Sequence, residues 1–385
     1  MTAVGLGIDQ TEYRARLAGL RARMAAQHLE LCLISTPENI FYLTGLDHWG
    51  YFAPHILMVP AGGEMILVTR AMESVTIAHQ VQNARFEGHG DQESAADVVS
   101  RLLLEHSRPI GRIGLEKWSA GLPFGLAVRL TRAVPAARWI DVTGVVDALR
   151  WVKSPAEQAC MRAAARVSDV AVSAAIEAIR TGVTERTIAA QCQRAMIEAG
   201  GTYPGFGPFI RSTPRLGEEH TTWGESVLAA GDAILLELSG CVRRYHAPLG
   251  RLVFLKSAPH GTERMAKVCL EAFDAALDAL RPGALAREIY AAWQRVVDAA
   301  GLAHYRRHHC GYLVGIGFPP SWTGGNRVTG LRHDSDLVIE TGMTFHILSW
   351  LMGTGQGDYF VSDTALLADD GPEVLTTAPR DLVLR

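Results

Sequence analysis

The sequence predicts a two-domain α/β protein whose second domain consists of two similar α+β halves, as after a duplication. Helix and strand signals alternate along the first part of the chain, to about residue 145. A strong helix start then occurs at Ser154-Pro155-Ala156-Glu157, and after it two helices followed by strands occur twice. This repeated order favours an antiparallel sheet backed by helices over a parallel βαβ array. At 385 residues the chain is long enough for two domains, which we place at 1–148 and 149–385.

The first domain carries the signals of a mixed α/β sheet. Residues 11–28 have apolar side chains at helical spacing, and LCLIST (31–36) is typical of a strand. HILMVP (55–60) and EMILVT (64–69), joined by AGG, predict a hairpin. Two further strands are expected within IGRIGLE and RWIDVT, on either side of a helix.

The second domain starts with a capping box. Ser154 and Glu157, with Pro155 at the first helical position, predict a helix that runs to Arg180. The elements expected next, in chain order, are a helix at about 184–198, strands at 209–213, 233–242 and 250–255, helices at about 262–280 and 284–300, and strands within YLVGIGF, MTFHILSWL and FVSDTALLA. The two halves would meet in a cleft, where we expect the functional site.

Composition narrows the class of protein. A net charge of −3 without a long basic run argues against nucleic acid as a partner, and no apolar stretch reaches the roughly 18 residues of a membrane span. The N-terminus lacks the basic and apolar regions of a secretory signal. The six cysteines include no CxxC pair, which fits reduced thiols. We therefore expect a cytoplasmic globular protein.

The phrase LRWVKSPAEQACMRAAARVSD, together with this organisation, resembles the creatinase / Xaa-Pro peptidase family. The resemblance covers essentially the whole chain. It implies a creatinase-like N-terminal α/β domain and a C-terminal catalytic domain with the pita-bread fold. It also implies homodimers.

Metal-dependent members of this family are expected to hold their ions with two aspartates, a histidine and two late glutamates. By this resemblance the ligand positions fall on Glu237, Pro248, Val314, Leu348 and near Ser362. Hard divalent ions need several oxygen ligands, and these residues offer one carboxylate. The alternative is that one strand is aligned with the family in the wrong register, but several ligand positions would have to be misaligned together. We expect no metal cofactor.

Glu237 and His220 are the predicted catalytic residues. Glu237 interrupts the apolar run Leu235–Leu238, and a desolvated carboxylate there could attack an electrophilic carbon. The alternative is a tolerated strand carboxylate that faces solvent. His220 lies in FIRSTPRLGEEHTTWGES, where the resemblance implies a substrate-contacting histidine, and imidazole suits general acid/base work. Without the family, a surface histidine would be the ordinary interpretation.

One branch of the family matches several local phrases. RYHAP (244–248), CGYLVGIGFPPSW (310–322), GMTFHI (342–347) and HTTWGES (220–226) resemble the ectoine hydrolases, which also lack the metal set. The resemblance implies opening of a cyclic amidine by a glutamate that matches Glu237. This chain departs from the branch at GDYFVSDT, where two glutamates are replaced by Phe360 and Asp363.

The predicted substrate-binding residues are mostly aromatic or histidine side chains near these phrases. TGLDHWGYFAPH (44–55) resembles a segment that reaches the neighbouring subunit's site in the family. Aromatic faces would attract a flat cation. Any of three arginines, Arg211, Arg244 and Arg251, could hold a substrate carboxylate. The predicted set is Trp223, His246, Tyr312, Trp322, His346, Phe360 and Asp363, with Trp49 and Tyr51 acting across the dimer.

The sequence therefore predicts a metal-independent hydrolase of a small cyclic amidine, such as ectoine, whose product would be an N-acetyl-diaminobutyrate. Three alternatives remain at this point. One is a creatinase-like hydrolase of another C–N bond in a guanidino compound or a cyclic amidine. Another is a non-catalytic binding module that has kept only the fold of a peptidase, and the third is a metal-dependent peptidase.

Overall fold

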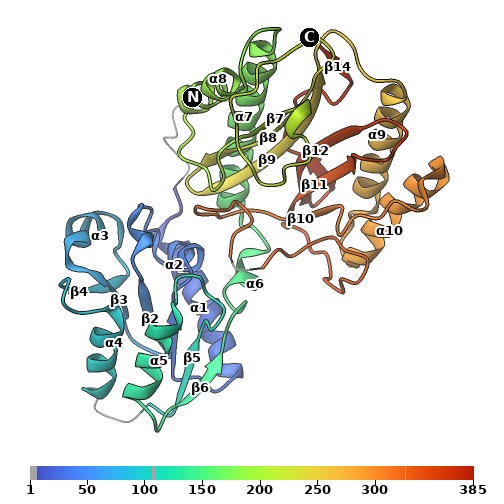
Figure 1. The fold of residues 1–385 in the computed structure, drawn as a ribbon. Helices are drawn as coiled ribbons and strands as arrows, with labels where there is room; N and C mark the ends of the chain where they lie inside the picture. The colour runs from blue at the N-terminus through green and yellow to red at the C-terminus, as the bar shows by residue number, and fades with distance from the viewer. Residues whose placement is uncertain (1–6, 106–109, 326) are drawn as a thin grey trace. The chain divides into compact units, whose positions relative to one another are not determined.

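A computed structural model describes residues 7–105, 110–325 and 327–385. The chain divides into two compact units (Figure 1), one formed by Gly7–Arg150 and the other by Trp151–Gly324 and Val328–Arg385. The two-domain α/β architecture predicted from the sequence is confirmed. No helix in the described ranges is long and apolar enough to cross a membrane.

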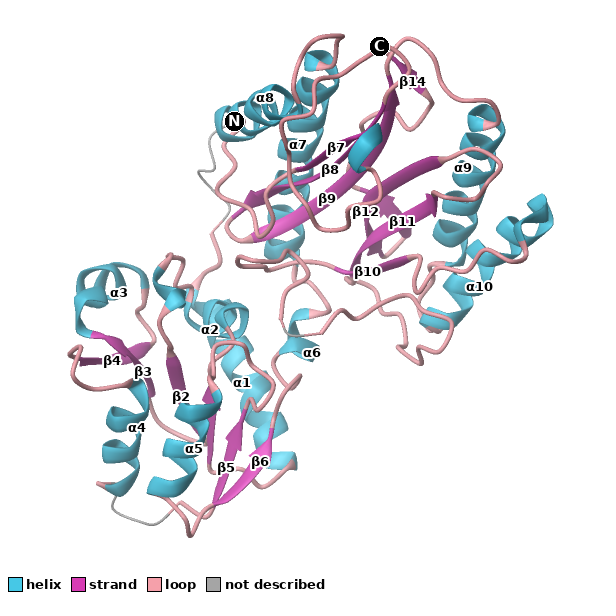
Figure 2. Ribbon diagram, in the orientation of Figure 1, coloured by secondary structure: helices cyan, strands magenta, loops and turns pink. Residues whose placement is uncertain are grey.

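The N-terminal unit is a six-stranded sheet flanked by helices (Figure 2). The strand order is β4-β3-β2-β1-β5-β6, with antiparallel pairing in β1–β2 and β2–β3 and parallel pairing elsewhere. The predicted 55–69 hairpin is β2–β3. The elements are α1 (Gln10–Ala26), β1 (Leu31–Ile34), α2 (Pro37–Thr44), β2 (Ile56–Pro60), β3 (Met65–Arg70), α3 (Ser74–Gln80), β4 (Ala84–His89), α4 (Ala95–Leu104), β5 (Arg112–Leu115), α5 (Phe124–Ala133), β6 (Arg138–Asp141) and α6 (Asp147–Arg150).

The C-terminal unit begins with the predicted capping box. The Ser154 hydroxyl accepts a hydrogen bond from the Glu157 amide at 3.2 Å, and the Glu157 carboxylate accepts one from the Ser154 amide at 3.0 Å. The elements that follow are α7 (Pro155–Ala178), α8 (Glu185–Glu198), β7 (Phe209–Ser212), β8 (Ala233–Val242), β9 (Tyr245–Phe254), α9 (Thr262–Ala279), α10 (Ala286–Val297), β10 (Gly311–Leu313), β11 (Thr344–Leu351), β12 (Tyr359–Ala368), β13 (Gly371–Val374) and β14 (Val383–Leu384).

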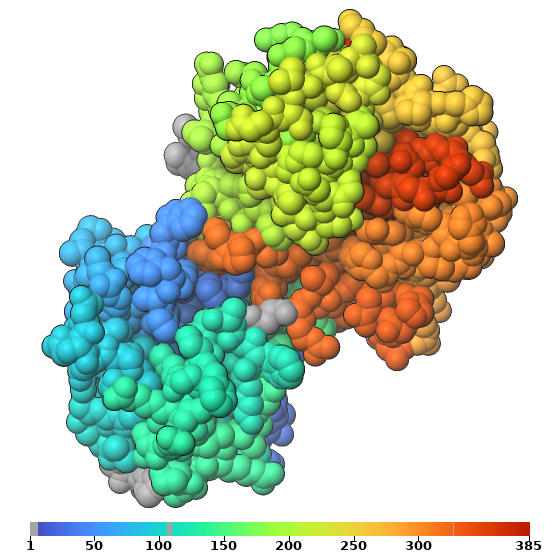
Figure 3. Space-filling view, in the orientation of Figure 1, coloured from blue at the N-terminus to red at the C-terminus, as the bar shows by residue number. Residues whose placement is uncertain are grey.

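Two similar halves share the sheet of this unit. Along the order β10-β11-β12-β9-β8-β7 every pairing is antiparallel. Helix α7 packs on β8 and β9, and α9 packs on β11 and β12. The halves lie side by side in the space-filling view, one green to yellow and the other orange to red (Figure 3). The helices cover one face of the sheet, and the opposite face carries the candidate site.

Gly240 identifies the helix-covered face of β8. A side chain built there would meet α7 at the Ala164 carbonyl oxygen. Because side chains alternate along a strand, Leu235, Glu237 and Ser239 point to the opposite face. On β11 the Ser349 hydroxyl accepts a bond from Trp293 of α10, so His346 and Leu348 also point away from the helices.

The predicted start of the return strand is wrong. We expected it at residue 250, but β9 begins at Tyr245 and includes Pro248, which pairs with Ser239. The ladder between β9 and β12 contains only the pairs at Gly250 and Arg251, so Pro248 lies beyond its end. The Pro248 carbonyl instead accepts a bond from the Thr364 side chain at 2.7 Å. A proline that has no amide hydrogen is tolerated where the neighbouring ladder needs none.

All six cysteines are buried and none is in a disulfide. Burial raises the pKa of Cys32, Cys192 and Cys269 to about 12. These thiols stay protonated at neutral pH and are inert core residues.

Candidate active site

Strand register brings the predicted residues together in two adjacent rows on the helix-free face. The first row crosses the strands through Phe209, Glu237, Gly250, Ser362 and Leu348. The second row runs through Ser239, Pro248, Thr364, His346 and Tyr312. One face therefore carries Glu237 together with Pro248, Leu348 and Ser362, three of the residues predicted to lie at the family's metal-ligand positions.

Glu237 is a buried carboxylate at the centre of this face. Its exposed fraction is 9%, and it makes no hydrogen bond or ion pair with the described residues. Burial raises its pKa to about 7, while the positive charges of Arg211 and Arg307 lower it and Glu219 raises it further. An unpaired carboxylate of this kind is costly to the fold, which is typical of a functional residue.

The neighbouring ligand positions supply few metal donors. Pro248 and Leu348 have no side-chain donor, Ser362 offers a neutral hydroxyl, and Val314 is a buried apolar residue. Within the described ranges no group of three or more His, Cys, Asp or Glu side chains could hold a metal ion. One carboxylate and one hydroxyl do not fit a two-metal centre, which needs bridging carboxylates.

An aromatic group borders Glu237 on the β7 side. The ring centroid of Phe206 lies 5.2 Å from that of Phe209 and 4.7 Å from that of Trp322. His220 lies on the same group, 6.2 Å from Phe206 and 6.1 Å from Phe209 between ring centroids, and its side chain is exposed. Phe209 is the cross-strand partner of Glu237. The two predicted catalytic residues, Glu237 and His220, are thus both neighbours of Phe209.

A chain of hydrogen bonds runs from Trp322 of this aromatic group to Ser362, which lies in the same cross-strand row as Glu237. Trp322 Nε1 donates to the Tyr312 hydroxyl at 3.0 Å. That hydroxyl is 2.9 Å from His346 Nδ1, and His346 Nε2 is 2.7 Å from the Ser362 hydroxyl. All four side chains are buried. Burial lowers the pKa of His346 well below its usual range, and the positive charge of Arg251 lowers it further, so the ring is neutral.

His246 and Trp223 lie near the aromatic group. His246 Nδ1 is 2.9 Å from the Arg244 carbonyl, and its Nε2 accepts a bond from the Gly205 amide at 2.8 Å. Both ring nitrogens are therefore used by backbone, and burial lowers the pKa of His246 to about 3. Trp223 is half-buried, and a Cβ built at Gly207 would lie 3.5 Å from its ring. His246 positions the backbone next to Phe206.

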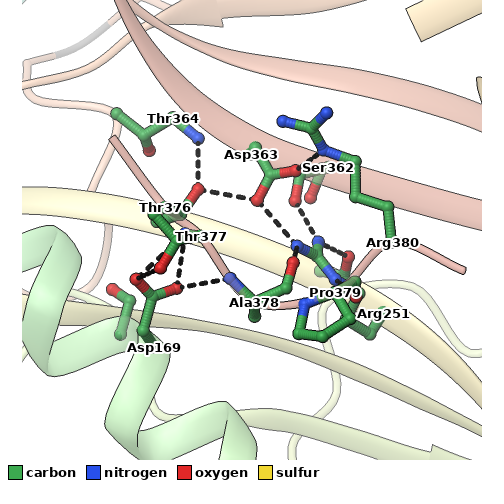
Figure 4. A network of polar contacts seen from close by, with 12 residues as sticks. Asp169, Arg251, Ser362, Asp363, Thr364, Thr376, Thr377, Ala378, Pro379 and Arg380 are labelled. Atoms are coloured by element: carbon green, nitrogen blue, oxygen red, sulfur yellow. Dashed lines mark hydrogen bonds and ion pairs between the residues drawn. The ribbon is translucent and has the colours of Figure 1, made fainter. Parts of the chain in front are cut away.

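Phe360 and Asp363 point to opposite faces of β12. Phe360 lies on the site face and packs on Trp350, with ring centroids 4.7 Å apart. Asp363 lies on the helix-covered face, where Arg251 Nη2 (2.9 Å), Arg380 Nε (2.6 Å) and the Thr376 hydroxyl (2.6 Å) all donate to it (Figure 4). Its carboxylate is buried in this network and does not share a face with Glu237.

The arginines differ in how many donors they have to spare. Arg244 donates to the carbonyls of Tyr203 and Gly317. Arg251 uses all its guanidinium nitrogens on the Asp363 carboxylate and on backbone carbonyls. Arg211 differs. It is on the site face of β7, donates to the Glu218 carbonyl, and its buried Nε has no partner among the described residues.

Sequence reasoning missed Arg307. Its guanidinium carbon lies 5.0 Å from the Trp350 ring centroid, its Nε has no partner among the described residues, and its charge acts on Glu237. The available signal was the run RRHHC, which places four basic residues directly before the strand β10. Trp49 and Tyr51 belong to the N-terminal unit, where Trp49 is exposed and Tyr51 donates to the Leu46 carbonyl at 3.1 Å. Their proposed action across a dimer stays a prediction.

Known proteins of similar sequence include hydrolases. The chain is 28% identical to the ectoine hydrolase of Halomonas elongata over 100% of both chains. It is 27% identical to an uncharacterized hydrolase/peptidase, y4tM, of Sinorhizobium fredii, over 99% of each, and 24% identical to a Xaa-Pro dipeptidase of Pyrococcus horikoshii, over 94% and 96%.

Solved structures share the fold over almost the whole chain. A prolidase from Thermococcus sibiricus superimposes with a TM-score of 0.87 at 19% identity, covering 98% of this chain and 100% of the other. A Xaa-Pro dipeptidase from Bacillus anthracis gives 0.84 at 20% identity, covering 97% and 100%. The pita-bread prediction is confirmed.

Family models match both domains. The creatinase/prolidase N-terminal domain matches residues 16–152, and metallopeptidase family M24 matches residues 159–369. The chain therefore belongs to metallopeptidase family M24 and carries the creatinase/prolidase N-terminal domain.

Proposed function

We propose that this protein is a metal-independent hydrolase that opens a small cyclic amidine, with ectoine or a close relative as substrate and an N-acetyl-diaminobutyrate as product. One observation carries the proposal: Glu237 is a buried, unpaired carboxylate on the face where the family's other ligand positions hold proline, valine, leucine and serine. The 28% identity to an ectoine hydrolase over the full chain supports the substrate class.

Charge complementarity supports the amidine. A protonated amidine is a flat cation with a carbon between two nitrogens. Next to a desolvated carboxylate it gains a Coulomb partner, and each ion relieves the burial cost of the other. The neighbouring ring group of Phe206, Phe209 and Trp322 offers faces that attract a cation.

In the proposed first step a Glu237 oxygen forms a bond to the amidine carbon and gives a neutral tetrahedral adduct. His220, in its protonated form, donates a proton to one ring nitrogen, and the bond from the amidine carbon to that nitrogen breaks. The substrate is then held as a protonated imidate on the Glu237 oxygen, with the released neutral amine still attached through the opened ring.

In the second step water adds to the carbon of the protonated imidate, and one of its protons passes to the released amine. The bond to Glu237 breaks and regenerates the carboxylate, and the protonated amide that remains returns its proton to His220. The net reaction converts an amidinium ion and water into an amide and an ammonium group, so atoms and charge balance. No step requires a metal ion.

Arg211 is our choice for the substrate carboxylate. Arg244 and Arg251 are committed to carbonyls and to Asp363, whereas Arg211 has an unpartnered Nε on the face of Glu237. Arg307 is a second candidate for the same reason. A zwitterionic substrate would place its cation on Glu237 and its anion on these guanidinium groups.

Several further assignments belong to the same proposal. Trp223, Tyr312, Trp322, His346 and Phe360 would shape the substrate site. Trp49 and Tyr51 would complete it from the second subunit of a homodimer in the cytoplasm. Hydrolysis of a guanidino C–N bond is the second candidate, because a guanidinium presents the same flat cation to Glu237.

Proton NMR of chelator-treated protein incubated with ectoine tests this function. We expect ring opening by the wild type and none by Glu237→Gln, with no gain when Mn²⁺, Co²⁺ or Zn²⁺ is added. Turnover that appears only after metal addition would refute metal independence. Absence of turnover on ectoine and on guanidino substrates such as creatine would favour a binding module.

A further inference from the structure

The buried chain Trp322–Tyr312–His346–Ser362 has one hydroxyl hydrogen to spare. The Trp322 indole can only donate, so the Tyr312 oxygen accepts from it. The neutral His346 ring carries one hydrogen, on either Nδ1 or Nε2. Each of these tautomers fixes the direction of both remaining bonds.

Two arrangements satisfy the three bonds. In the first, Tyr312 donates to His346 Nδ1, Nε2–H donates to Ser362, and the Ser362 hydroxyl hydrogen is free. In the second, Nδ1–H donates to Tyr312, Ser362 donates to Nε2, and the Tyr312 hydroxyl hydrogen is free. A shift of one hydrogen along each bond converts one into the other, and His346 stays neutral throughout.

Both ends of the chain border Glu237. Ser362 lies in the same cross-strand row, and the residue between them is Gly250, over which the Phe360 ring packs next to the Ser362 hydroxyl. A Cβ at Gly250 would come within 2.8 Å of the Ser362 hydroxyl. At the other end, Tyr312 is close enough for the Glu237 charge to act on its phenol.

We propose that this chain is a proton relay that carries the proton of the attacking water to the released amine in the second step of the reaction. Water gives a proton to Ser362 as the Ser362 hydrogen passes to His346 Nε2, the Nδ1 hydrogen passes to Tyr312, and the Tyr312 hydrogen passes to the amine. The water oxygen bonds to the imidate carbon, and the amine becomes ammonium. One proton enters and one leaves.

The relay rests on the proposed function and explains why a cyclic substrate suits the site. Only ring opening keeps the amine attached, so that it is still beside Tyr312 when water attacks. The relay lies where the resemblance would place a metal centre, because Ser362 is at one of the predicted ligand positions. It supplies proton transfer by neutral groups in a buried place where a charged histidine would be costly.

Nitrogen-15 NMR of the histidine rings tests the relay without any substrate. Tyr312→Phe removes the acceptor for an Nδ1 hydrogen, so we expect His346 to hold its hydrogen on Nε2. Ser362→Ala removes the acceptor at Nε2 and should move the hydrogen to Nδ1. His346→Gln assigns the signals. The same tautomer in both variants would overturn the relay.

Rapid acid quenching with ectoine, followed by mass spectrometry, tests the proton path. Glutamine can keep the hydrogen bonds of His346 but cannot exchange tautomers, so His346→Gln should form the Glu237 adduct within about twofold of the wild-type rate. Breakdown of the adduct should slow at least about 100-fold. Breakdown of the adduct at the wild-type rate in His346→Gln, or equal slowing of adduct formation and breakdown, would overturn the proposed path.

Ser349→Ala is the matched control, because it removes a buried Trp–Ser hydrogen bond on the helix-covered face of β11. It should change neither step by more than about twofold. If the wild type forms neither adduct nor product, the proposed function fails, and the transfer to an amine fails with it. The tautomer measurement then decides separately whether the hydrogen-bonded chain behaves as a relay.

Discussion

Glu237→Gln should stabilise this protein at alkaline pH. The side chain is buried without a partner among the described residues, and its pKa is raised from 4.5 to about 7. The folded state therefore binds the proton more tightly than the unfolded state does. Stability is greatest below about pH 4.5 and falls as the pH rises through 7, because ionisation is easier in the unfolded chain.

The magnitude follows from the two pKa values. At about 1.36 kcal/mol per pKa unit the buried charge costs about 3 kcal/mol at pH 8, and at pH 5 the cost falls below about 1 kcal/mol. Glutamine has nearly the same shape and no charge, so it should recover this free energy. We expect the variant to be more stable by up to about 3 kcal/mol at pH 8, with a smaller gain at pH 5.

Urea denaturation followed by tryptophan fluorescence measures the effect, since five tryptophans (Trp151, Trp223, Trp293, Trp322 and Trp350) report on the C-terminal unit. Glu185→Gln is the contrast. Glu185 is also buried, but its carboxylate accepts bonds from Arg215, from Ser212 and from the Gly224 amide, so its replacement should destabilise. A Glu237→Gln variant that loses stability, or gains equally at both pH values, would refute the reasoning.

Three further predictions concern activity and stability. The kcat/KM for ectoine should rise with pH up to about 7, because only ionised Glu237 can attack; a profile that is flat from pH 5 to 7 would count against this. Arg211→Met should raise the KM for ectoine at least about tenfold and leave unchanged the KM for an ectoine analogue that lacks the carboxylate. Equal increases in KM for both compounds would refute the carboxylate contact. Asp363→Asn should lower the free energy of unfolding by about 3 kcal/mol, because Arg251 and Arg380 lose their shared carboxylate; an unchanged urea midpoint would contradict that structural role.

Local signals in the sequence were enough for most of the fold. The Ser154–Glu157 capping box predicted the start of α7, and the apolar run at 233–242 coincides with β8. The start of β9 was missed because a proline normally marks a strand end, and only the short ladder with β12 explains how Pro248 fits inside one. That ladder joins segments more than 100 residues apart in the chain.

The site was harder to predict because it depends on which face each side chain occupies. Glu237 and His220 were found by their phrases, and the structure places Phe209 next to both, as the cross-strand partner of Glu237 and 6.1 Å from His220 between ring centroids. Asp363 was grouped with Phe360 as an adjacent replacement, yet alternation along β12 sends it to the opposite face. No phrase revealed which arginines would have a nitrogen to spare, because that depends on carbonyls from distant loops.

The most direct test of the central claim is to look for the covalent adduct on Glu237. Chelator-treated protein would be mixed with ectoine, quenched in acid within the first turnover, digested, and analysed by mass spectrometry. We predict a mass increase equal to that of ectoine on the peptide that contains Glu237, and no increase in Glu237→Gln. Product formation by the wild type without any adduct, or by Glu237→Gln at an undiminished rate, would contradict the account.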